Sequence, residues 1–266
     1  MRRWATLPVL ALALAAGCTA EPGASDDLRI VSLNPCSDAI LAEVAPEKLV
    51  GISHYSHDPR SSSMPKAEAR LYPAVSGSVE EVAALRPDVV VASTFLAPAN
   101  ARAFERLGIR VERVGIAGTV AESAAQVREL AALAEEPAAG EALVQRMESA
   151  PRAQTTDRPT ALVWQTGGIV AGPGSLVAEL VERAGFARHA AARGLGQGAY
   201  LPLEQVLADP PDVIIAAGGE RALSHPALKH LPDTHYAALD PALLYCGGPT
   251  VPRLAARLAE IRAGAE

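Results

Sequence analysis

The chain has 266 residues, of which 49% are apolar and 20% are charged. These proportions are typical of a water-soluble globular protein with one or two domains. The formal net charge is −6 and the chain contains no run of lysine or arginine, which argues against nucleic acid as the main partner. Because only 4% of the residues are aromatic, alanine, valine and leucine must supply most of the core.

The first 17 residues have the pattern of an export signal. Arg2 and Arg3 precede an apolar run that is too short to span a membrane as a stable helix. The run ends in "AAGC", a pattern typical of lipoprotein signals, which predicts Cys18 as the lipidated first residue of the mature protein. The alternative is ordinary cleavage beside an incidental cysteine. Residues 18–27 are small, polar and acidic, and we interpret them as a flexible tether. We therefore expect a periplasmic protein anchored to a membrane through an N-terminal lipid.

The next part of the chain alternates between strand-like and helix-like segments. The strands are short apolar runs, and the helices show apolar residues at helical spacing. Expected strands are residues 28–34, 49–53, 89–92 and 109–114, and expected helices are residues 37–45, 79–85, 97–108 and 119–134, with a polar loop over 54–72. Helical character continues over 135–149 and is interrupted near Pro137, because proline lacks a backbone N–H.

The alternation resumes after a turn over 151–159. Expected strands are residues 160–166, 213–217 and 234–239, and expected helices are residues 175–185, 203–208 and 250–264. Apolar strands that alternate with helices predict an α/β fold, in which parallel sheets are covered by helices on both faces.

One phrase of the sequence occurs twice. "VEEVAALRPDVVVAS" begins at Val79 and "LEQVLADPPDVIIAA" begins at Leu203, which is 124 positions later. This spacing is far too long for a solenoid repeat and favours two similar lobes with one copy each. We expect an N-terminal lobe over 28–135, a connecting helix and turn over 136–158, and a C-terminal lobe over 159–266.

Candidate ligand-binding residues follow from the predicted strands, because ligands of open parallel sheets bind beyond the carboxyl ends of the strands. Aromatic side chains at these ends would stack on a planar ligand, although core packing is the alternative for each of them. The candidates are Asn34, Pro35, Cys36, Tyr55, His57, Phe95, Trp164, Tyr200 and Tyr245.

The sequence predicts neither a catalytic centre nor a resident metal or cofactor. No Ser-His-Asp or Cys-His arrangement stands out, and the glycine-rich pieces do not match a dinucleotide fingerprint. His54, His57 and Asp58 lie in one loop, but a bare metal site needs three or four converging ligands. A periplasmic metal-dependent enzyme, or a sensor lipoprotein on a similar scaffold, is the alternative of another class.

Two cysteines remain if Cys18 carries lipid. Cys36 and Cys246 fall on predicted strand-to-helix loops, one in each lobe. In an oxidising compartment they are a candidate disulfide that would tie the lobes together beside the cleft. The alternative is a pair of free thiols that contact the ligand.

From about Leu28 to its end, the chain resembles the substrate-binding proteins of bacterial ABC importers for metal chelates, and among them the vitamin B12-binding members most. The resemblance is carried by "RIVSLNP", "SDAILAEV", "LVGISHYSHDP", "SGSVEEVAALRPDVVVA" and "LGIRVERV". It implies two α/β lobes joined by a long helix, with the ligand in the cleft between them. The tryptophan that B12-binding members carry shortly before their first-lobe glutamate falls near Val75 here, so the chain departs from them at that point.

The same resemblance implies the cargo and the partner. The cargo would be a small-molecule metal chelate, with cobalamin or a related corrinoid first and a ferric siderophore or haem as the alternatives. Glu80 and Glu204 match the two glutamates, one per lobe, that pair with arginines of the ABC transporter permease in this family. We therefore expect a monomeric binding protein that is not an enzyme.

Overall fold

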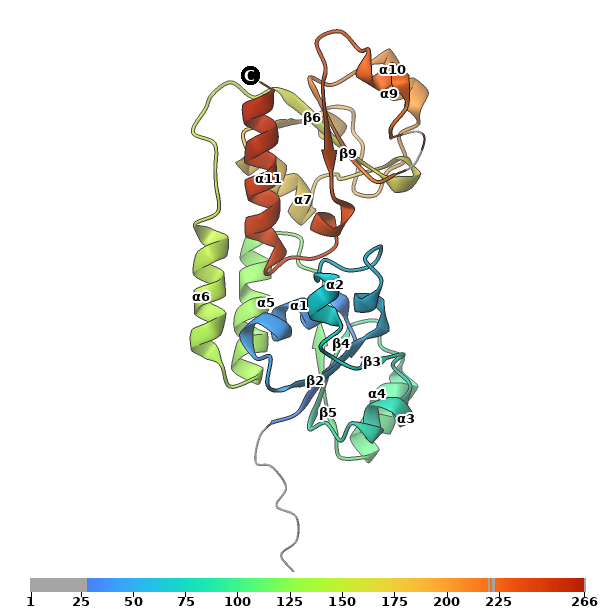
Figure 1. The fold of residues 1–266 in the computed structure, drawn as a ribbon, viewed down its shortest axis with the longest axis vertical. Coiled ribbons are helices and arrows are strands. Elements are labelled where there is room, and N and C mark those ends of the chain that lie inside the picture. Colours follow the sequence, from blue (N-terminus) through green and yellow to red (C-terminus); the bar gives the residue numbers. More distant parts are fainter. Residues whose placement is uncertain (1–27, 220, 222, 266) are drawn as a thin grey trace, which may run out of the picture.

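The protein consists of two lobes stacked along the long axis of the molecule (Figure 1). The structure, a computed structural model, describes residues 28–219, 221 and 223–265. The predicted signal peptide, Cys18 and the tether lie outside these residues. The expectation of an α/β protein with two parallel-sheet lobes is confirmed. Within the described part of the chain, no helix is long and apolar enough to cross a membrane.

The first lobe contains a fully parallel sheet with the strand order β3-β2-β1-β4-β5. Its strands are β1 (Ile30–Ser32), β2 (Leu49–Ser53), β3 (Ala74–Val75), β4 (Val89–Ser93) and β5 (Arg110–Val114). Its helices are α1 (Pro35–Val44), the 3-10 helix η1 (His54–His57), α2 (Lys66–Ala69), α3 (Val79–Ala84) and α4 (Pro98–Arg106). The segment expected as an irregular loop over 54–72 therefore contains η1 and α2.

The second lobe contains a mostly parallel sheet with the order β10-β9-β6-β7, and β8 also pairs with β6. Its strands are β6 (Thr160–Gln165), β7 (Ile169–Val170), β8 (Ala187–Arg188), β9 (Val213–Ala217) and β10 (His235–Leu239). Its helices are η2 (Thr166–Gly168), α7 (Leu176–Arg183), α8 (His189–Ala192), α9 (Leu203–Ala208), α10 (Pro226–Lys229), η3 (Pro241–Leu244) and α11 (Thr250–Gly264).

One edge of the second sheet differs from the all-parallel expectation. Strand β7 runs antiparallel to β6. Gly167 and Gly168 follow β6 directly and have φ values of 77° and 73°, a region in which glycine is not strained. These two residues reverse the chain, so β7 returns along the strand it has just left.

The lobes are connected by two helices followed by an extended segment, rather than by one long helix. Helices α5 (Val120–Leu133) and α6 (Pro137–Glu148) lie side by side (Figure 1). Glu135 adopts a φ of 58° between them, and Pro137 stands at the start of α6, where its missing N–H costs no helical hydrogen bond. Residues 149–159 then lead to β6.

One hydrophobic core runs through both lobes. A single cluster of buried side chains includes Ile30 and Ile40 of the first lobe, Val127 of α5, and Ile215 and Leu258 of the second lobe. The outer face of each sheet has its own smaller cluster. The lobes also share a buried hydrogen bond at 2.8 Å from the Gly248 backbone N–H to Ser123 Oγ. Since close-packed cores deform little, this shared core holds the lobes in a defined relation.

The repeated phrase supplies the same structural part to each lobe. Each copy forms a short helix, α3 or α9, and the buried strand that follows it, β4 or β9. Asp88 Oδ2 accepts the backbone N–H of Arg29, just before β1, at 2.8 Å. Asp212 Oδ2 accepts the N–H and the hydroxyl of Thr160, the first residue of β6, at 2.6 and 2.7 Å. In both lobes the repeated aspartate therefore holds the start of the neighbouring strand.

Candidate ligand-binding site

A cavity of about 330 Å³ lies between the lobes, and segments of both lobes line it. The first lobe contributes Asn34, Cys36, residues 114–118 and Gln126, and the second lobe contributes residues 174–177, Gln197 and residues 244–247. Several of these segments follow the carboxyl ends of β1, β5 and β10, which is where parallel sheets present ligands.

The loop after β1 is shaped by three of the predicted residues. Asn34 is the N-cap of α1, and its Oδ1 accepts the backbone N–H of Cys36 at 2.8 Å. Pro35 follows at the first helical position, where its fixed φ suits a helix start. Local sequence therefore places Asn34 and Cys36 on the wall of the cavity.

Cys36 and Cys246 join in a disulfide, with a Cα–Cα distance of 5.1 Å and a sequence separation of 210 residues. Both residues line the cavity, and each belongs to a different lobe. The bond therefore crosses from lobe to lobe at the wall of the candidate site.

Four of the predicted aromatic side chains are exposed to solvent. The exposed fractions are 54% for Tyr55, 80% for Phe95, 65% for Tyr200 and 40% for Tyr245. Tyr245 lines the cavity itself. Phe95 follows β4, and the preceding Thr94 donates its N–H to the carbonyl of Val114, a cavity residue. Exposed aromatic rings are suited to stack on a planar ligand.

Charge around Tyr245 comes from both lobes. Burial raises the pKa of Tyr245, and the carboxylates of Asp240 and of Asp58 in the first-lobe loop raise it further. Asp58 forms an ion pair with Arg60 at 2.8 Å, and the hydrogen bonds from Arg60 hold the pKa of Asp58 at about 2. Tyr245 is therefore a neutral phenol at pH 7, available as a hydrogen-bond donor.

Two predicted ligand contacts have other positions. Trp164 is 1% exposed and lies in the outer core of the second lobe, where its Nε1 donates to the carbonyl of Leu201 at 2.9 Å. The expectation that Trp164 lines the cleft is therefore wrong, because its side chain packs on the outer face of the sheet. His57 Nε2 lies 3.0 Å from the carbonyl of Ala69 and 3.3 Å from that of Tyr72, so this ring fastens the loop to itself.

His54 is held in a similar way, with Nδ1 3.2 Å from the carbonyl of Val75 and its ring against Tyr55. Among the described residues, no group of three or more histidine, cysteine, aspartate or glutamate side chains is placed to hold a metal ion.

Other cavity residues were not among the sequence candidates. Gln126, Gln197 and residues 115–118, which include the highly exposed Ile116, line the site. The loop 115–118 directly follows β5, so the strand-end rule, applied to the strand expected over 109–114, would have found it. Gln126 projects from α5 and Gln197 from a long loop, and no local pattern marks either.

Glu80 and Glu204 occupy matching places outside the cavity. Each lies in the first turn of its short helix and is exposed. Helices α3 and α9 both lie on the side of the molecule away from α5 and α6 (Figure 1). Within the described part of the chain, neither carboxylate makes a hydrogen bond or an ion pair, whereas the neighbouring Glu81 accepts the Ser76 N–H at 2.7 Å.

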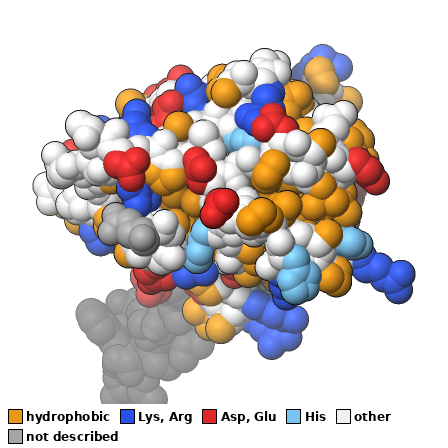
Figure 2. Space-filling view, turned by 90° about the horizontal axis from the view of Figure 1, so that it is seen from above, with side chains coloured by type: hydrophobic (Ala, Val, Ile, Leu, Met, Phe, Trp, Pro, Cys, Tyr) orange, Lys and Arg blue, Asp and Glu red, His pale blue; other side chains and the backbone are white. Residues whose placement is uncertain are grey.

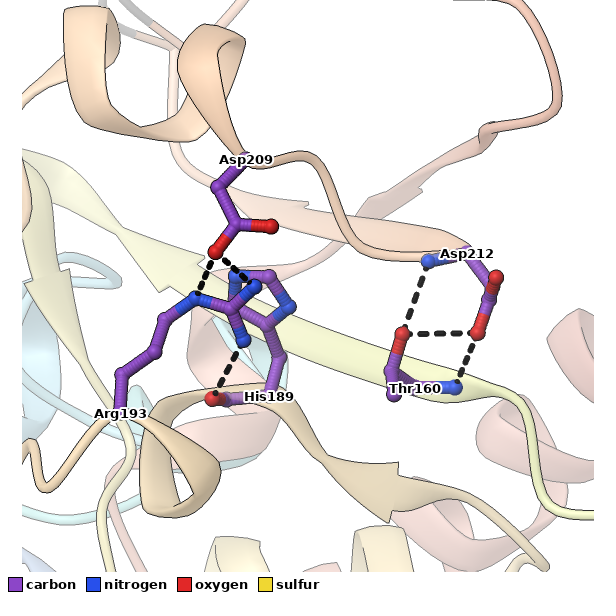
Figure 3. Close-up of polar contacts among 5 residues, drawn as sticks. All are labelled: Thr160, His189, Arg193, Asp209 and Asp212. Atoms are coloured by element: carbon purple, nitrogen blue, oxygen red, sulfur yellow. Dashed lines mark hydrogen bonds and ion pairs between the residues drawn. The ribbon is translucent and has the colours of Figure 1, made fainter.

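Helix α9 is anchored by polar contacts that Figure 3 shows in close-up. Arg193 points toward Asp209, the C-cap of α9, with Nε 2.7 Å from the carboxylate, and its Nη1 donates to the carbonyl of His189 at 3.2 Å. Burial, and then the charge of Arg193, lowers the pKa of His189 to about 4, so this ring is neutral at pH 7. At the other end of α9, the Leu201 N–H donates to the Gly168 carbonyl at 2.8 Å.

Two α/β lobes that enclose a cavity beside the carboxyl ends of their strands define a ligand-binding protein of the two-lobed type. The chain belongs to the periplasmic binding protein family, whose model matches residues 30–234, more than half of the chain. It is therefore a substrate-binding protein and not an enzyme. No curated protein sequence matches it.

Several solved structures share the fold. The apo form of the periplasmic haem-binding protein RhuT from Roseiflexus sp. RS-1 is 22% identical, with a TM-score of 0.70 over 90% of this chain and 98% of that chain. The periplasmic haem-binding protein HutB of Vibrio cholerae is 18% identical, with a TM-score of 0.71 over 88% and 98%. The periplasmic vitamin B12-binding protein BtuF of Vibrio cholerae is 20% identical, with a TM-score of 0.66 over 89% and 97%.

Proposed function

We propose that this protein captures a metal tetrapyrrole in the periplasm, with a corrinoid such as cobalamin as the first candidate, and delivers it to an ABC transporter permease. The observation that carries the proposal is the chemistry of the cavity between the lobes. Its described lining contains amide, hydroxyl and apolar side chains together with many glycines, and no charged side chain. A cargo with a neutral periphery is matched to such a wall, because a charge buried there would have no partner.

Two glutamine side chains of the cavity wall are suited to bind amide groups of a ligand. Gln126 Nε2 donates to the carbonyl of Gly115 at 2.9 Å, which leaves Gln126 Oε1 as an acceptor. Gln197 Oε1 accepts the N–H of Gly172 at 2.9 Å, which leaves the Gln197 amino group as a donor. The edge of a corrinoid carries primary amides, each of which needs a donor and an acceptor, whereas haem carries two propionates that need cations.

Haem is the second candidate. Five similar structures are named as haem-binding proteins, RhuT and HutB among them, and the exposed Tyr245 lines the cavity. A tyrosine binds ferric iron as the phenolate, and the raised pKa of Tyr245 disfavours that form at this position. A ferric siderophore is the third candidate, and an anionic one would meet the same uncharged wall.

Titration of the purified protein with cyanocobalamin, hemin and a ferric siderophore tests the proposal. Emission of Trp164 reports binding, because absorbing tetrapyrroles quench a buried indole by energy transfer without contact. Calorimetry supplies the affinities. We expect cyanocobalamin to bind most tightly, and Gln126→Glu to weaken hemin binding more than cyanocobalamin binding. Saturable binding of hemin or the siderophore alone would reassign the cargo, and binding of none of them would remove the proposal.

Delivery to a permease is supported by Glu80 and Glu204. Their carboxylates make no internal contact among the described residues and occupy matched helices on one side of the molecule. In Figure 2, which looks onto the end of the second lobe, acidic side chains are set among hydrophobic ones. Charge pairs between binding partners favour orientation and encounter rate, so two separated carboxylates would orient the loaded monomer on arginines of the permease.

Anchoring through Cys18 is part of the same proposal and follows from the "AAGC" pattern. Metabolic labelling with a fatty acid should mark the full-length protein in the membrane fraction and should not mark Cys18→Ser. An unlabelled protein in the soluble periplasmic fraction would contradict the lipid anchor.

A further inference from the structure

Asp38 carries a carboxyl group that is fully buried beneath the first-lobe side of the site. It lies in the first turn of α1 and has no solvent exposure. Its Oδ2 accepts the Ser53 backbone N–H at 3.0 Å and the Ser56 hydroxyl at 2.6 Å. Its Oδ1 has no hydrogen-bond partner among the described residues. A carboxyl in this position is costly to bury and has no part in the cavity wall.

The hydrogen bonds of Asp38 continue into one segment of chain, residues 53–64, which we call the ligand loop. Ser62 Oγ lies 3.5 Å from Ser56 Oγ and accepts the N–H of Met64 at 3.1 Å. Ser53, Ser56 and Ser62 are all buried. The ligand loop is therefore tied to α1 by a backbone N–H and a serine hydroxyl that both reach Asp38, and its buried Met64 belongs to the hydrophobic core.

The ligand loop also reaches the site and the second lobe. It carries Tyr55, which is exposed, and Asp58, whose charge acts on Tyr245. The carbonyl of Ser63 accepts a hydrogen bond at 3.2 Å from Arg253 Nη1 on α11. A substitution of Asp38 would therefore shift the loop residues beside Tyr245, although Asp38 itself does not contact the ligand.

We propose that Asp38 is a positioning residue for ligand binding, whose carboxyl, through its hydrogen bonds to Ser53 and Ser56, holds the ligand loop, and with it Tyr55, in the binding arrangement. The role in ligand binding rests on the proposed function, and the hold on the loop does not.

The protonation state of Asp38 follows from its surroundings. Burial raises the pKa of Asp38 to about 8, against the opposing influence of the nearby Ser32 hydroxyl and of the hydrogen bonds from Ser56 and Ser53. The elements packed against α1 are β1, β2, η1, α5 and α6. None of their charged groups contributes to this shift; these groups are His54, His57, Glu122, Arg128, Glu129, Glu141, Arg146 and Glu148.

The sign of the pH effect follows. In an open loop the carboxyl is solvated and its pKa returns to about 4, so the closed loop binds the proton more tightly between about pH 4 and pH 8. Raising the pH through this window therefore favours opening, and the effect levels off above about pH 8. Asparagine at this position removes the ionisation and with it the pH dependence.

Limited trypsin digestion measures how readily the ligand loop opens, and it needs no ligand. Arg60 lies in the ligand loop with an exposed side chain, and cleavage there is scored by mass spectrometry relative to cleavage at Arg102 in α4. From pH 6.5 to 8.5 we expect relative cleavage of the wild type at Arg60 to rise about tenfold. In Asp38→Asn the relative cleavage at Arg60 should not change with pH. Asp38→Ala should be cleaved quickly at every pH.

Ligand affinity is measured on the same variants with cyanocobalamin and hemin. Asp38→Ala should bind about tenfold more weakly, as expected from loss of a buried hydrogen-bonded group, and Asp38→Asn should bind as the wild type does. If Asp38→Ala does not fold, Ser56→Ala removes the loop side of the same contact, with Ile214→Val, a small buried truncation in the outer core of the second lobe, as the control.

Three results would overturn the inference. They are unchanged cleavage at Arg60 in both Asp38→Ala and Ser56→Ala, an Asp38→Asn protein with the pH dependence of the wild type, or a loop that opens with no loss of affinity for a probe that the wild type binds. If the wild type binds neither probe, the proposed function fails, while the digestion still decides whether Asp38 holds the loop.

Discussion

Tyr55 and Tyr245 come from different lobes and are both about half exposed. Tyr55 stacks at a tilt on His54 with ring centroids 4.1 Å apart, so one face of a preformed aromatic pair is presented. Tyr245 lines the cavity beside the disulfide. Aromatic rings that already occupy a fixed place lose little conformational freedom when a ligand covers them.

We expect Tyr55→Ala and Tyr245→Ala each to weaken binding of the cargo about tenfold, because stacking and apolar burial against a planar ring contribute on the order of 1.4 kcal/mol. Calorimetric titration measures the change. Leu107→Ala is the matched control, since Leu107 is an exposed apolar residue at the far end of α4. Equal effects of all three substitutions would speak against an aromatic binding surface.

At the scale of elements, each repeated aspartate holds the start of the neighbouring strand, but the two make unequal numbers of hydrogen bonds. Asp88 accepts one backbone N–H from the start of the first sheet, whereas Asp212 accepts both the N–H and the hydroxyl of Thr160. The hydrogen bonds from Thr160 lower the pKa of Asp212. The second lobe therefore depends more on its copy of the residue than the first lobe does.

Asp212→Asn should destabilise the protein at pH 7 by about 1 kcal/mol, and Asp88→Asn by less, because charge-assisted hydrogen bonds at an exposed site are worth that order. The contribution of Asp212 is present above its unfolded pKa near 4 and is lost as the pH falls through its lower folded value. Urea unfolding at pH 7 and pH 3 measures both effects. A difference between wild type and Asp212→Asn that persists unchanged at pH 3 would contradict this account.

The position of the elements was predictable to a large extent, and the details of their joints were not. Apolar periodicity located the main strands and helices, because that pattern is local. The antiparallel return of β7 depends on two glycines in the left-handed region, and the separation of α5 from α6 depends on Glu135 as well as on Pro137. The conformation of such turns depends on the tertiary contacts that the following segment makes.

At the scale of the whole molecule, the disulfide and the shared core act on the same joint. Cys36 and Cys246 close a loop of 210 residues, and the core cluster runs through both lobes beside them. Both features restrict how far the lobes can separate. The first lobe and the second lobe should therefore unfold together.

Cys36→Ser combined with Cys246→Ser should lower the free energy of unfolding by about 2–4 kcal/mol, the usual range when a disulfide closes a long loop. Urea denaturation of the oxidised wild type and of the double variant measures the difference. Addition of a reductant should bring the wild type to the stability of the variant. A wild type whose stability is indifferent to reduction would contradict the bond.

Docking is also a property of the whole molecule, since it requires one glutamate from each lobe. Charge reversal by Glu80→Lys with Glu204→Lys should abolish ligand uptake by cells, because it sets cation against cation at the permease, while the affinity for ligand stays within about twofold of the wild type. Glu47→Lys with Glu129→Lys carries the same change of net charge on exposed residues elsewhere and should transport normally. Loss of ligand affinity in the first pair would count against a docking role.

The sequence by itself determined the α/β class, the existence of two lobes and the strand-end loops that border the site, because these follow from local periodicity, from the repeated phrase and from the geometry of parallel sheets. Only the tertiary structure decided which side chains of those loops stay exposed. The Trp164 side chain packs in the outer core of the second lobe, whereas Tyr245 lines the cavity. Gln126 and Gln197 also line the cavity, and Asp38 is buried among serines. These outcomes depend on segments far apart in the chain packing against one another, and burial, unlike periodicity, is not a local property.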